Sequence, residues 1–412
     1  VELRAGGDGF LPMKNRRYPM DSSEVLIPLD EMDASSPFGK SFKSARVPYR
    51  RVTKCVLAIL LIMMIYAFVS FLLHLNSIQT TFPPFDPRPL SEPQVLSDGA
   101  SVYRIAVITD LDKDSKTDDG KKWRSYFRRG RLTVSSDLSR VSVDWDEQKD
   151  DVSLLSEVSS GGRAMELSDL VVFDRNLLTV DDRTGILYKI DDFSSASEVH
   201  VVPWVILADG PGNVSKSFKG EWMTVKDSHL YVGGLGKEWT NQKGEYINDH
   251  PMWVKRVDAW GRVEHQQWTH TYKEVRRSMS IEWPGYMVHE AVQWSDVHKK
   301  WFFLPRRVSR EAYDEDADEG RGSNVLVVAD ELFESTPTVT RIGTNDEPST
   351  RGFAAFQFVP NTNDQLIIAL KSEEKDGHPV GSCVTVFDIS GKVLLQEQQL
   401  QGAYKFEGLA II

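Results

Sequence analysis

Short apolar runs separated by polar turns recur along most of this chain. One example is the mainly apolar run 222–225, which is followed by a polar turn at 226–229 and by a second apolar run at 230–232. Two short apolar runs around such a turn are typical of a β-hairpin. An acidic residue, Glu221, stands directly before the first run. This pattern therefore predicts a hairpin with a carboxylate at its head.

The same pattern recurs, with an acid at the head of every copy except one, where alanine replaces it. The fifth copy is a single apolar run with no partner after it. The spacing of the heads is roughly 60 residues, which is typical of radial repeats of β-sheets. We therefore expect an all-β fold, a five-bladed β-propeller, preceded by a single N-terminal transmembrane helix. The five heads are Asp169, Glu221, Glu290, Ala355 and Glu407.

The ends of the repeat region predict how the ring closes. The apolar run 103–109 has no acid before it, and the final run 406–412 has no second strand. Propellers commonly complete one blade with strands from both termini, so these two runs should pair. One short helix is expected at 273–280. The further strand pairs expected in the blades are 132–136 with 141–146, 187–190 with 201–205, 253–257 with 263–268, 325–329 with 339–342, and 384–389 with 394–399.

Residues 55–75 form an apolar run without Lys, Arg, Asp or Glu. Its length, about 21 residues, is enough to cross a bilayer as one helix. A buried soluble helix is the alternative, but no polar face interrupts the run. Residues 40–54 carry several basic residues and no acid, so the positive-inside rule places the N-terminus in the cytosol. We find no small-residue cleavage site and expect a retained signal anchor.

The sequence thus divides into four expected parts. They are a flexible cytosolic tail at 1–54, the anchor at 55–75, a Pro-rich lumenal stalk at 76–101 and the propeller domain at 102–412. Asn213 begins an Asn-Val-Ser glycosylation sequon, which suits a lumenal domain. Cys383 is the one cysteine of the lumenal part, so no internal disulfide is expected. We expect a buried, inert thiol, with pairing between chains as the alternative.

In a propeller, the innermost strands line the central channel, so heads far apart in the chain meet there. Glu221, Glu290 and Glu407 should all face this axis. Three carboxylates in a narrow channel repel one another unless a cation neutralises them. Hard oxygen ligands suit Ca²⁺, which takes six to eight of them. The strand carbonyls of Ser168 and Ala354 are further candidate ligands.

Several other chemistries are disfavoured. Residues 233–237 resemble a phosphate-binding loop but are followed by Glu238 where Ser or Thr is required. The acidic stretches 110–114 and 314–320 lack the spacing of an EF-hand. His289 has no second histidine at the zinc-protease spacing. The net charge of −11 argues against a nucleic-acid partner.

Several motifs resemble those of the calcium-activated nucleotidases of the apyrase type, a family with arthropod salivary members and a vertebrate membrane-anchored form. The resemblance covers essentially residues 102–412, and the layout of the whole chain is similar to that of the vertebrate form. The motifs are MELSD at 165–169, VDDRTG at 180–185, GEW at 220–222, GGLGKEW at 233–239, FFLPRR at 302–307 and EG at 407–408.

The resemblance implies a propeller with one axial Ca²⁺ that hydrolyses nucleoside di- and triphosphates to monophosphates. UDP and GDP are preferred to ADP in the vertebrate type, and a calcium-induced homodimer is possible. The family commonly has serine where Ala354 and Ala355 stand, so calcium affinity here depends on whether that position binds through its carbonyl. The implied calcium ligands are Ser168, Glu221, Glu290, Ala354 and Glu407, with Asp169 adjacent.

Phosphoanhydride cleavage requires positive groups around the phosphates and a carboxylate that positions water. Arg306 and Arg307 are expected to clamp the phosphates, although a strand-end ion pair is the alternative. Trp239 is expected to stack on a base or to pack a blade. Asp112 or Asp182 is the candidate that orients or deprotonates the attacking water, and Glu166 is the reserve candidate for this role. Asp110 is expected to contact the substrate.

Two other functions stay open at this point. Five-bladed glycoside hydrolases also set acids around a propeller axis, and a non-catalytic lumenal binding propeller would need no reaction. For a nucleotidase, we expect a type II single-pass protein of the Golgi or endoplasmic reticulum membrane, which proteolysis of the stalk could also release. There it would remove the UDP and GDP left by glycosyl transfer and so support glycosylation and proteoglycan synthesis.

Overall fold

The computed structural model describes residues 49–79, 84–193, 199–344, 349–376 and 378–412. The chain divides into two units, residues 1–82 and 83–412. The described part of the first unit is one helix, α1 (Tyr49–Gln79). Its segment Thr53–Leu73 is long and apolar enough to cross a membrane. This agrees with the expected span at 55–75, while the expected tail lies almost entirely outside the described residues.

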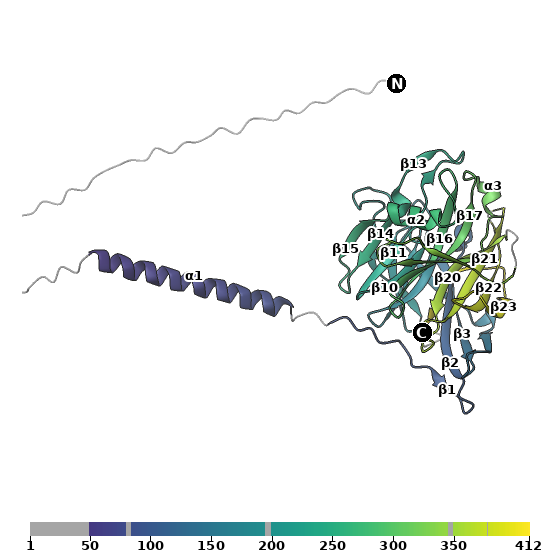
Figure 1. The fold of residues 1–412 in the computed structure, drawn as a ribbon, viewed down its shortest axis with the longest axis horizontal. Helices are drawn as coiled ribbons and strands as arrows, with labels where there is room; N and C mark the ends of the chain where they lie inside the picture. The colour runs from purple at the N-terminus through teal and green to yellow at the C-terminus, as the bar shows by residue number, and fades with distance from the viewer. Residues whose placement is uncertain (1–48, 80–83, 194–198, 345–348, 377) are drawn as a thin grey trace, which may run out of the picture. The chain divides into compact units, whose positions relative to one another are not determined.

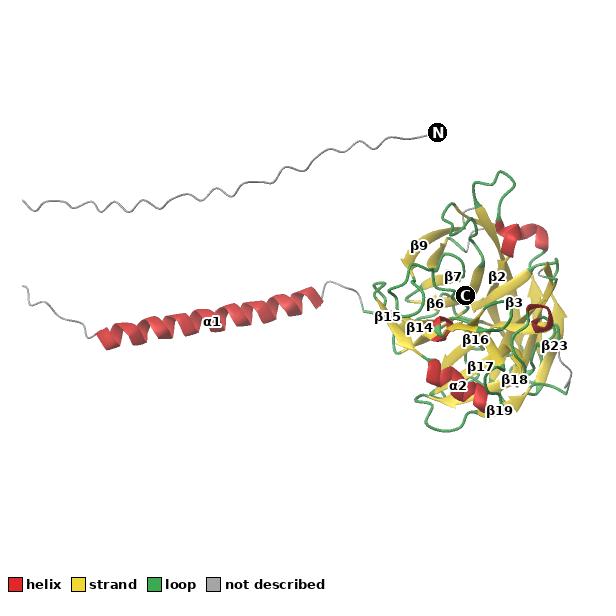
Figure 2. Cartoon of the chain, turned by 90° about the horizontal axis from the view of Figure 1, so that it is seen from above, coloured by secondary structure: helices red, strands yellow, loops and turns green. Residues whose placement is uncertain are grey.

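The second unit consists mainly of antiparallel strands (Figures 1 and 2) arranged, over the described residues, as a five-bladed propeller. Four blades are four-stranded sheets in simple sequence order. Their strands are β6 (Leu167–Phe173), β7 (Asn176–Asp181), β8 (Ile186–Asp191) and β9 (His200–Ile206); β10 (Trp222–Lys226), β11 (His229–Gly233), β14 (Trp253–Val257) and β15 (Val263–Gln267); β16 (Tyr286–Ser295), β17 (Lys300–Ser309), β18 (Val325–Asp330) and β19 (Thr338–Arg341); and β20 (Arg351–Phe358), β21 (Leu366–Lys375), β22 (His378–Asp388) and β23 (Val393–Gln399).

Both ends of the domain contribute to the remaining blade. β24 (Lys405–Ile411) pairs antiparallel with β2 (Ser101–Asp110), and the register places Ile105 opposite Ile411. The ring therefore closes as the sequence predicts. All of the expected strand pairs are present as well. The other strands of this blade are β1 (Gln94–Val95), β3 (Trp123–Val134), β4 (Val141–Trp145) and β5 (Val152–Ser156).

The expected short helix is α2 (Thr269–Arg277), which begins four residues earlier than predicted. Its first turn contains two threonines and a histidine, which have low helix propensity. The sequence therefore gave no signal that the helix starts at Thr269. Tertiary contacts hold the helix instead. Tyr272 and Val275 are buried, and Arg276 pairs with Glu238 at 2.8 Å. Other short elements are α3 (Glu315–Asp318) and the β12 (Trp239–Thr240) and β13 (Tyr246–Asn248) ribbon.

The C-terminal part of the expected stalk is packed against the propeller. The ring of Phe85 lies 5.2 Å from that of Phe173 on β6. Ser91 donates a hydrogen bond to the Ile412 carbonyl at 2.6 Å, and Arg175 donates to the Pro89 carbonyl at 2.7 Å. These contacts extend the compact unit well before residue 102, where we expected it to start.

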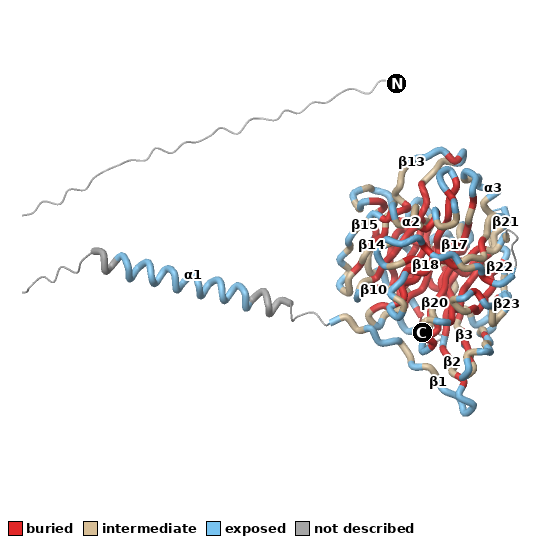
Figure 3. The backbone as a smooth tube through the Cα atoms, viewed as in Figure 1, coloured by how far each residue is buried: buried red, intermediate tan, exposed pale blue. Residues whose placement is uncertain are grey.

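The strands inside the domain are largely buried (Figure 3), and the core lies between neighbouring blades. One cluster joins Phe406 and Leu409 of β24 to Ile368 of β21 and Val384 of β22. Cys383 lies beside this cluster on β22 and is buried, and burial raises the pKa of its thiol to about 12. A thiol in that state is a poor nucleophile, so Cys383 is the inert cysteine that we expected.

Candidate active site

β-Bulges interrupt four of the innermost strands among the described residues, each at the head of its repeat. The pairing of β6 skips Asp169, that of β20 skips Ala354 and that of β24 skips Glu407. In β16 the interruption includes Glu290. A bulge takes a residue out of the ladder and changes the direction of its side chain. Ala354, rather than Ala355, therefore occupies the position of the acids, which corrects our alignment by one residue.

The structure brings the three axial glutamates to one cavity of about 900 Å³. Glu221, Glu290 and Glu407 line it, and each side chain is largely buried. Burial raises the pKa of Glu221 to about 8, and the neighbouring Glu290 adds to the shift. Burial also raises the pKa of Glu290 and Glu407. These glutamates come from three different blades, so the fold assembles the carboxylate cluster.

Each of the three glutamates is paired with a Lys or Arg side chain. Arg306 Nη1 lies 2.7 Å from Glu290 and 3.4 Å from Glu407. Lys219 lies 2.6 Å from Glu221, and Lys405 lies 3.5 Å from Glu407. The charges of the cluster are thus partly balanced within the protein itself.

Arg306 is held by further groups on β21. It donates to Ser372 at 2.6 Å and to Glu374 at 2.5 Å. Although burial opposes the shift, Arg306 and Lys405 lower the pKa of Glu374 to about 2. Arg307 also lines the cavity, but its Nη1 donates to the Thr350 carbonyl at 3.1 Å. Arg306 is therefore the more closely linked of the two arginines to the axial acids.

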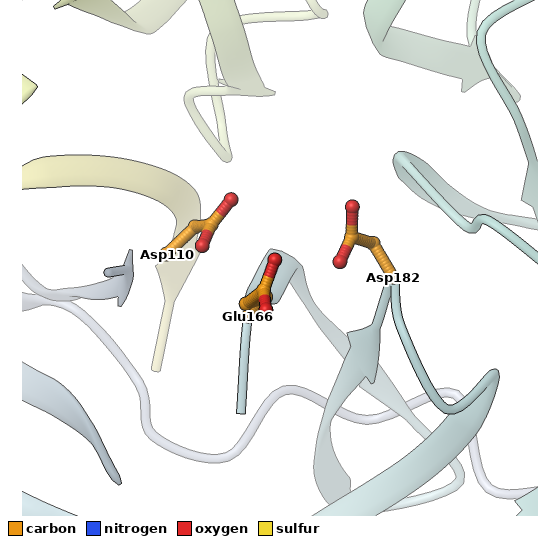
Figure 4. Close-up of side chains that lie close together, drawn as sticks. All are labelled: Asp110, Glu166 and Asp182. Carbon is orange, nitrogen blue, oxygen red and sulfur yellow. The ribbon is translucent and has the colours of Figure 1, made fainter. Parts of the chain in front are cut away.

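A second cluster of carboxylates lies in the wall of the same cavity (Figure 4). One oxygen each of Asp110, Glu166 and Asp182 lies within 4.8 Å of the others. All three residues are buried. Burial raises the pKa of Glu166 to about 8, and the neighbouring charges of Asp110 and Asp182 contribute. Arg163 balances Glu166 through two hydrogen bonds, one of them 2.7 Å long.

Asp112 lies next to this cluster, just after the end of β2. Its carboxylate lies 2.7 Å from Lys405 and 3.2 Å from Arg163, and its side chain is 30% exposed. Its backbone has a φ of +47°, in the left-handed region. Non-glycine residues rarely adopt this backbone conformation, and those that do are often found at functional sites. Asp112 therefore offers a carboxylate that solvent reaches.

Two lysines connect the clusters, and sequence reasoning missed both. Lys219 contacts Asp182 as well as Glu221, and Lys405 lies 2.7 Å from Asp110 as well as near Glu407. Each lysine stands two residues before an axial glutamate. This shared Lys-x-Glu spacing was the available signal.

Three of the implied metal ligands lie behind the cavity wall. Asp169 accepts hydrogen bonds from the backbone amides of Leu170, at 2.8 Å, and Met223, at 2.6 Å. Both of its oxygens are thus engaged, and the carboxylate ties β6 to β10. Ser168 donates to Glu407 at 3.4 Å, so its hydroxyl orients an axial acid. Ala354 is buried and offers backbone groups alone.

The remaining predicted residues occupy separate places. Trp239 is half-buried and lines the cavity, and the Lys216 ammonium lies 4.4 Å from the centre of its ring. A ring in this position is accessible to a ligand in the cavity. Asn213 is exposed in a turn, as a glycosylation sequon requires.

Comparisons with known proteins identify the family. The sequence model of the family described as Apyrase matches residues 111–412. The chain belongs to the apyrase family. It is 56% identical over 313 residues to "Apyrase apy-1" of Caenorhabditis elegans, covering 76% of this chain and 85% of that protein. It is 48% identical over 327 residues to "Soluble calcium-activated nucleotidase 1" of Rattus norvegicus, covering 79% and 78%.

A solved GH43 β-1,3-galactosidase aligns with 66% of this apyrase and 90% of its own chain. The sequence identity is 8% and the TM-score is 0.35, too low to bear on fold or activity.

The cavity of this apyrase is strongly acidic. Among the described residues that line it, fourteen are acidic and eight are Lys or Arg. The formal excess is therefore six negative charges, concentrated where any ligand would bind. An anionic ligand would be repelled from this cavity unless cations entered with it.

Proposed function

We propose that this apyrase hydrolyses nucleoside diphosphates and triphosphates to nucleoside monophosphates and phosphate in a calcium-dependent reaction. Membership of the apyrase family and the printed names of the relatives support this proposal. The observation that carries it is the acidic cavity with three axial glutamates, since a phosphate-binding site of this charge requires a bound cation.

The residues present fit a calcium ion. Glu221, Glu290 and Glu407 supply hard oxygens, and their raised pKa values show that burial makes their charges costly without a cation. Ser168 holds one of these acids in place, and the Ala354 carbonyl is a further candidate ligand. Asp169 is the poorest candidate because it does not line the cavity and its carboxylate ties β6 to β10 through backbone amides. When bound, calcium would neutralise charge on the phosphates.

Arg306 is the proposed phosphate clamp. In the structure its guanidinium is shared among Glu290, Glu374 and Glu407. Once Glu290 and Glu407 serve as metal ligands, the guanidinium can donate to phosphate oxygens, with Ser372 and Glu374 holding its orientation. Arg307 has its own partner at Thr350 and therefore contributes mainly charge to this wall.

Asp112 is the proposed group that positions the attacking water. It reaches solvent, and Lys405 and Arg163 fix its carboxylate at the mouth of the cavity. Asp182 is more deeply buried and is tied to Lys219. Glu166, held by Arg163, remains the reserve candidate for positioning the water.

Trp239 is the proposed stacking surface for the base, with UDP and GDP as the preferred substrates.

Phosphate release from UDP, GDP, ADP and UTP, with calcium and with a chelator, tests the whole proposal. We expect release that stops in chelator and is fastest with UDP and GDP. Turnover of a glycoside without nucleotide hydrolysis, or no turnover at all, would instead support one of the two alternative functions.

The proposed setting is the lumen of the Golgi or endoplasmic reticulum, with the chain anchored by α1 and the N-terminus in the cytosol. The apolar segment Thr53–Leu73 and the exposed sequon at Asn213 support this orientation. There the enzyme would remove nucleoside diphosphates left by glycosyl transfer. Wild type should lose mass when treated with a glycosidase, and Asn213→Gln should not. This comparison tests the lumenal placement. Unchanged glycosylation in cells without the protein would contradict the role. Dimerisation with calcium is a further proposal that light scattering tests.

A further inference from the structure

We propose that Asp110, Glu166 and Asp182 bind a second divalent cation, distinct from the axial ion, whose remaining ligands are the diphosphate oxygens of the substrate. This inference rests on the proposed nucleotidase function and specifies how the substrate is held. The ion would be a hard cation such as Ca²⁺, because all three side chains offer carboxylate oxygens.

The geometry of the three carboxylates suits one ion. Asp110 ends β2, Glu166 stands directly before β6 and Asp182 directly follows β7, so three segments converge at this point. Their oxygens lie within 4.8 Å of one another, and the side chains extend toward a common space (Figure 4). Calcium binds oxygens at about 2.3–2.6 Å, so ligands on opposite sides of it are roughly 5 Å apart. The observed separation therefore fits an ion between the three groups.

A second, independent feature points to a missing ligand. Asp182 Oδ1 is buried and has no hydrogen-bond partner among the residues that the structure describes. The residue is only 6% exposed, and its other oxygen, Oδ2, contacts Lys219. A buried polar atom without a partner costs about 1–3 kcal/mol. A cation in the adjacent space would satisfy this oxygen.

Two lysines, the buried Lys405 and the partly buried Lys219, separate this site from the axial glutamates. The Lys219 ammonium lies between Asp182 and Glu221, and the Lys405 ammonium lies 2.7 Å from Asp110 and 3.5 Å from Glu407. These positive groups reduce the repulsion between the two sets of acids. They also give each carboxylate cluster its own position, so the two sets do not merge into one site.

The site is incomplete without a ligand from the cavity. Three carboxylates are fewer than the six to eight oxygens that calcium takes, and all three line the open cavity. The charge balance points the same way. One axial divalent ion reduces the formal excess of six negative charges to four, and a nucleoside diphosphate then adds more. A second cation that enters with the diphosphate offsets part of that repulsion.

Equilibrium dialysis of the full chain in detergent with ⁴⁵Ca²⁺ tests this inference. The probe is UDP in which a methylene group replaces the bridging oxygen, so that it is not hydrolysed. We expect the wild-type chain to gain one calcium ion per chain when this analogue is added. In Glu166→Gln and, separately, Asp110→Asn, the calcium concentration that half-saturates this additional ion should rise at least ten-fold.

Asp316→Asn is the matched control, because Asp316 is an exposed acid that lines the same cavity outside both clusters. It should gain the additional ion as the wild type does. Thermal unfolding midpoints and near-ultraviolet circular dichroism establish that each variant is folded, and a variant that fails to fold is replaced by the other of the pair.

The inference is wrong if the wild-type chain gains no calcium with the analogue, or if folded Glu166→Gln or Asp110→Asn gains it at the wild-type concentration. Phosphate release from UDP is measured on the same samples. Calcium-dependent release without the additional ion overturns the second site and leaves the proposed function standing. Absence of release from every nucleotide by the wild-type chain contradicts the proposed function itself.

Discussion

Replacing Arg306 by methionine should destabilise the propeller strongly in chelator and less in calcium. Arg306 is 4% exposed, and its guanidinium contacts Glu290, Glu374 and Glu407 as well as the hydroxyl of Ser372. Methionine has a similar length and fills the space, but it leaves the buried Glu290 and Glu407 and the partly exposed Glu374 without this partner. Arg306→Met therefore isolates the electrostatic contribution of the guanidinium.

Removing one partner of a buried ion pair typically costs about 3–5 kcal/mol. Lys405 remains near Glu374 and Glu407, at 3.6 and 3.5 Å, which places the expected loss at the lower end, about 3 kcal/mol. Calcium at 100 times its dissociation constant would stabilise the folded state by about 2.7 kcal/mol. Wild type gains this stabilisation too, so calcium reduces the loss only as far as the variant binds the ion more tightly than wild type. Without the arginine the glutamates are freer to bind it, and about 30-fold tighter binding would recover about 2 kcal/mol of the loss.

The assay is urea unfolding followed by tryptophan fluorescence, for wild type and variant, in chelator and in calcium. We expect a loss of about 3 kcal/mol in chelator and of about 1 kcal/mol in calcium, the difference reflecting tighter calcium binding by the variant. Arg306→Lys, which retains a positive charge, is the control and should lose less in chelator. An equal loss in both conditions would show that removing the guanidinium leaves calcium affinity unchanged, which contradicts competition between Arg306 and calcium for these glutamates.

Three further predictions concern closure, pH and water. Deleting residues 407–412 should abolish cooperative unfolding by calorimetry, because most of β24 and the buried Leu409 are lost. Burial, with Arg276 nearby, lowers the pKa of His289 from 6.5 to about 3, so the unfolded state binds more protons below pH 6.5. On acidification from pH 7 to 4.5, wild type should therefore lose on the order of 2 kcal/mol more than His289→Leu in urea unfolding. Asp112→Asn should lower kcat for UDP about 100-fold with little change in KM, and a change confined to KM would contradict its role.

Much of the propeller could be predicted because its signals are local. Each hairpin is two apolar runs around a polar turn, and the unpaired runs at the two ends of the domain indicated how the ring closes. The docked segment containing Phe85 could not be recognised, because its contacts with Phe173 and the chain end are set by the tertiary fold. The start of α2 was missed for the same reason.

The site was predicted in outline and missed in detail. The heads of the repeats indicated that Glu221, Glu290 and Glu407 would meet, and all three line one cavity. The one-residue shift at Ala354 comes from a β-bulge, which an ungapped alignment does not show. The roles of Lys219 and Lys405 depend on contacts between blades, so residue spacing alone could suggest their faces but not their partners.

The most direct test of the account is a crystal structure of the domain grown with calcium, with the ion located by its anomalous scattering. The account predicts a peak bounded by carboxylate oxygens of Glu221, Glu290 and Glu407, and a guanidinium of Arg306 that has moved from at least one of them. A calcium-saturated crystal with no peak among these glutamates, and with Arg306 still paired to them, would contradict it.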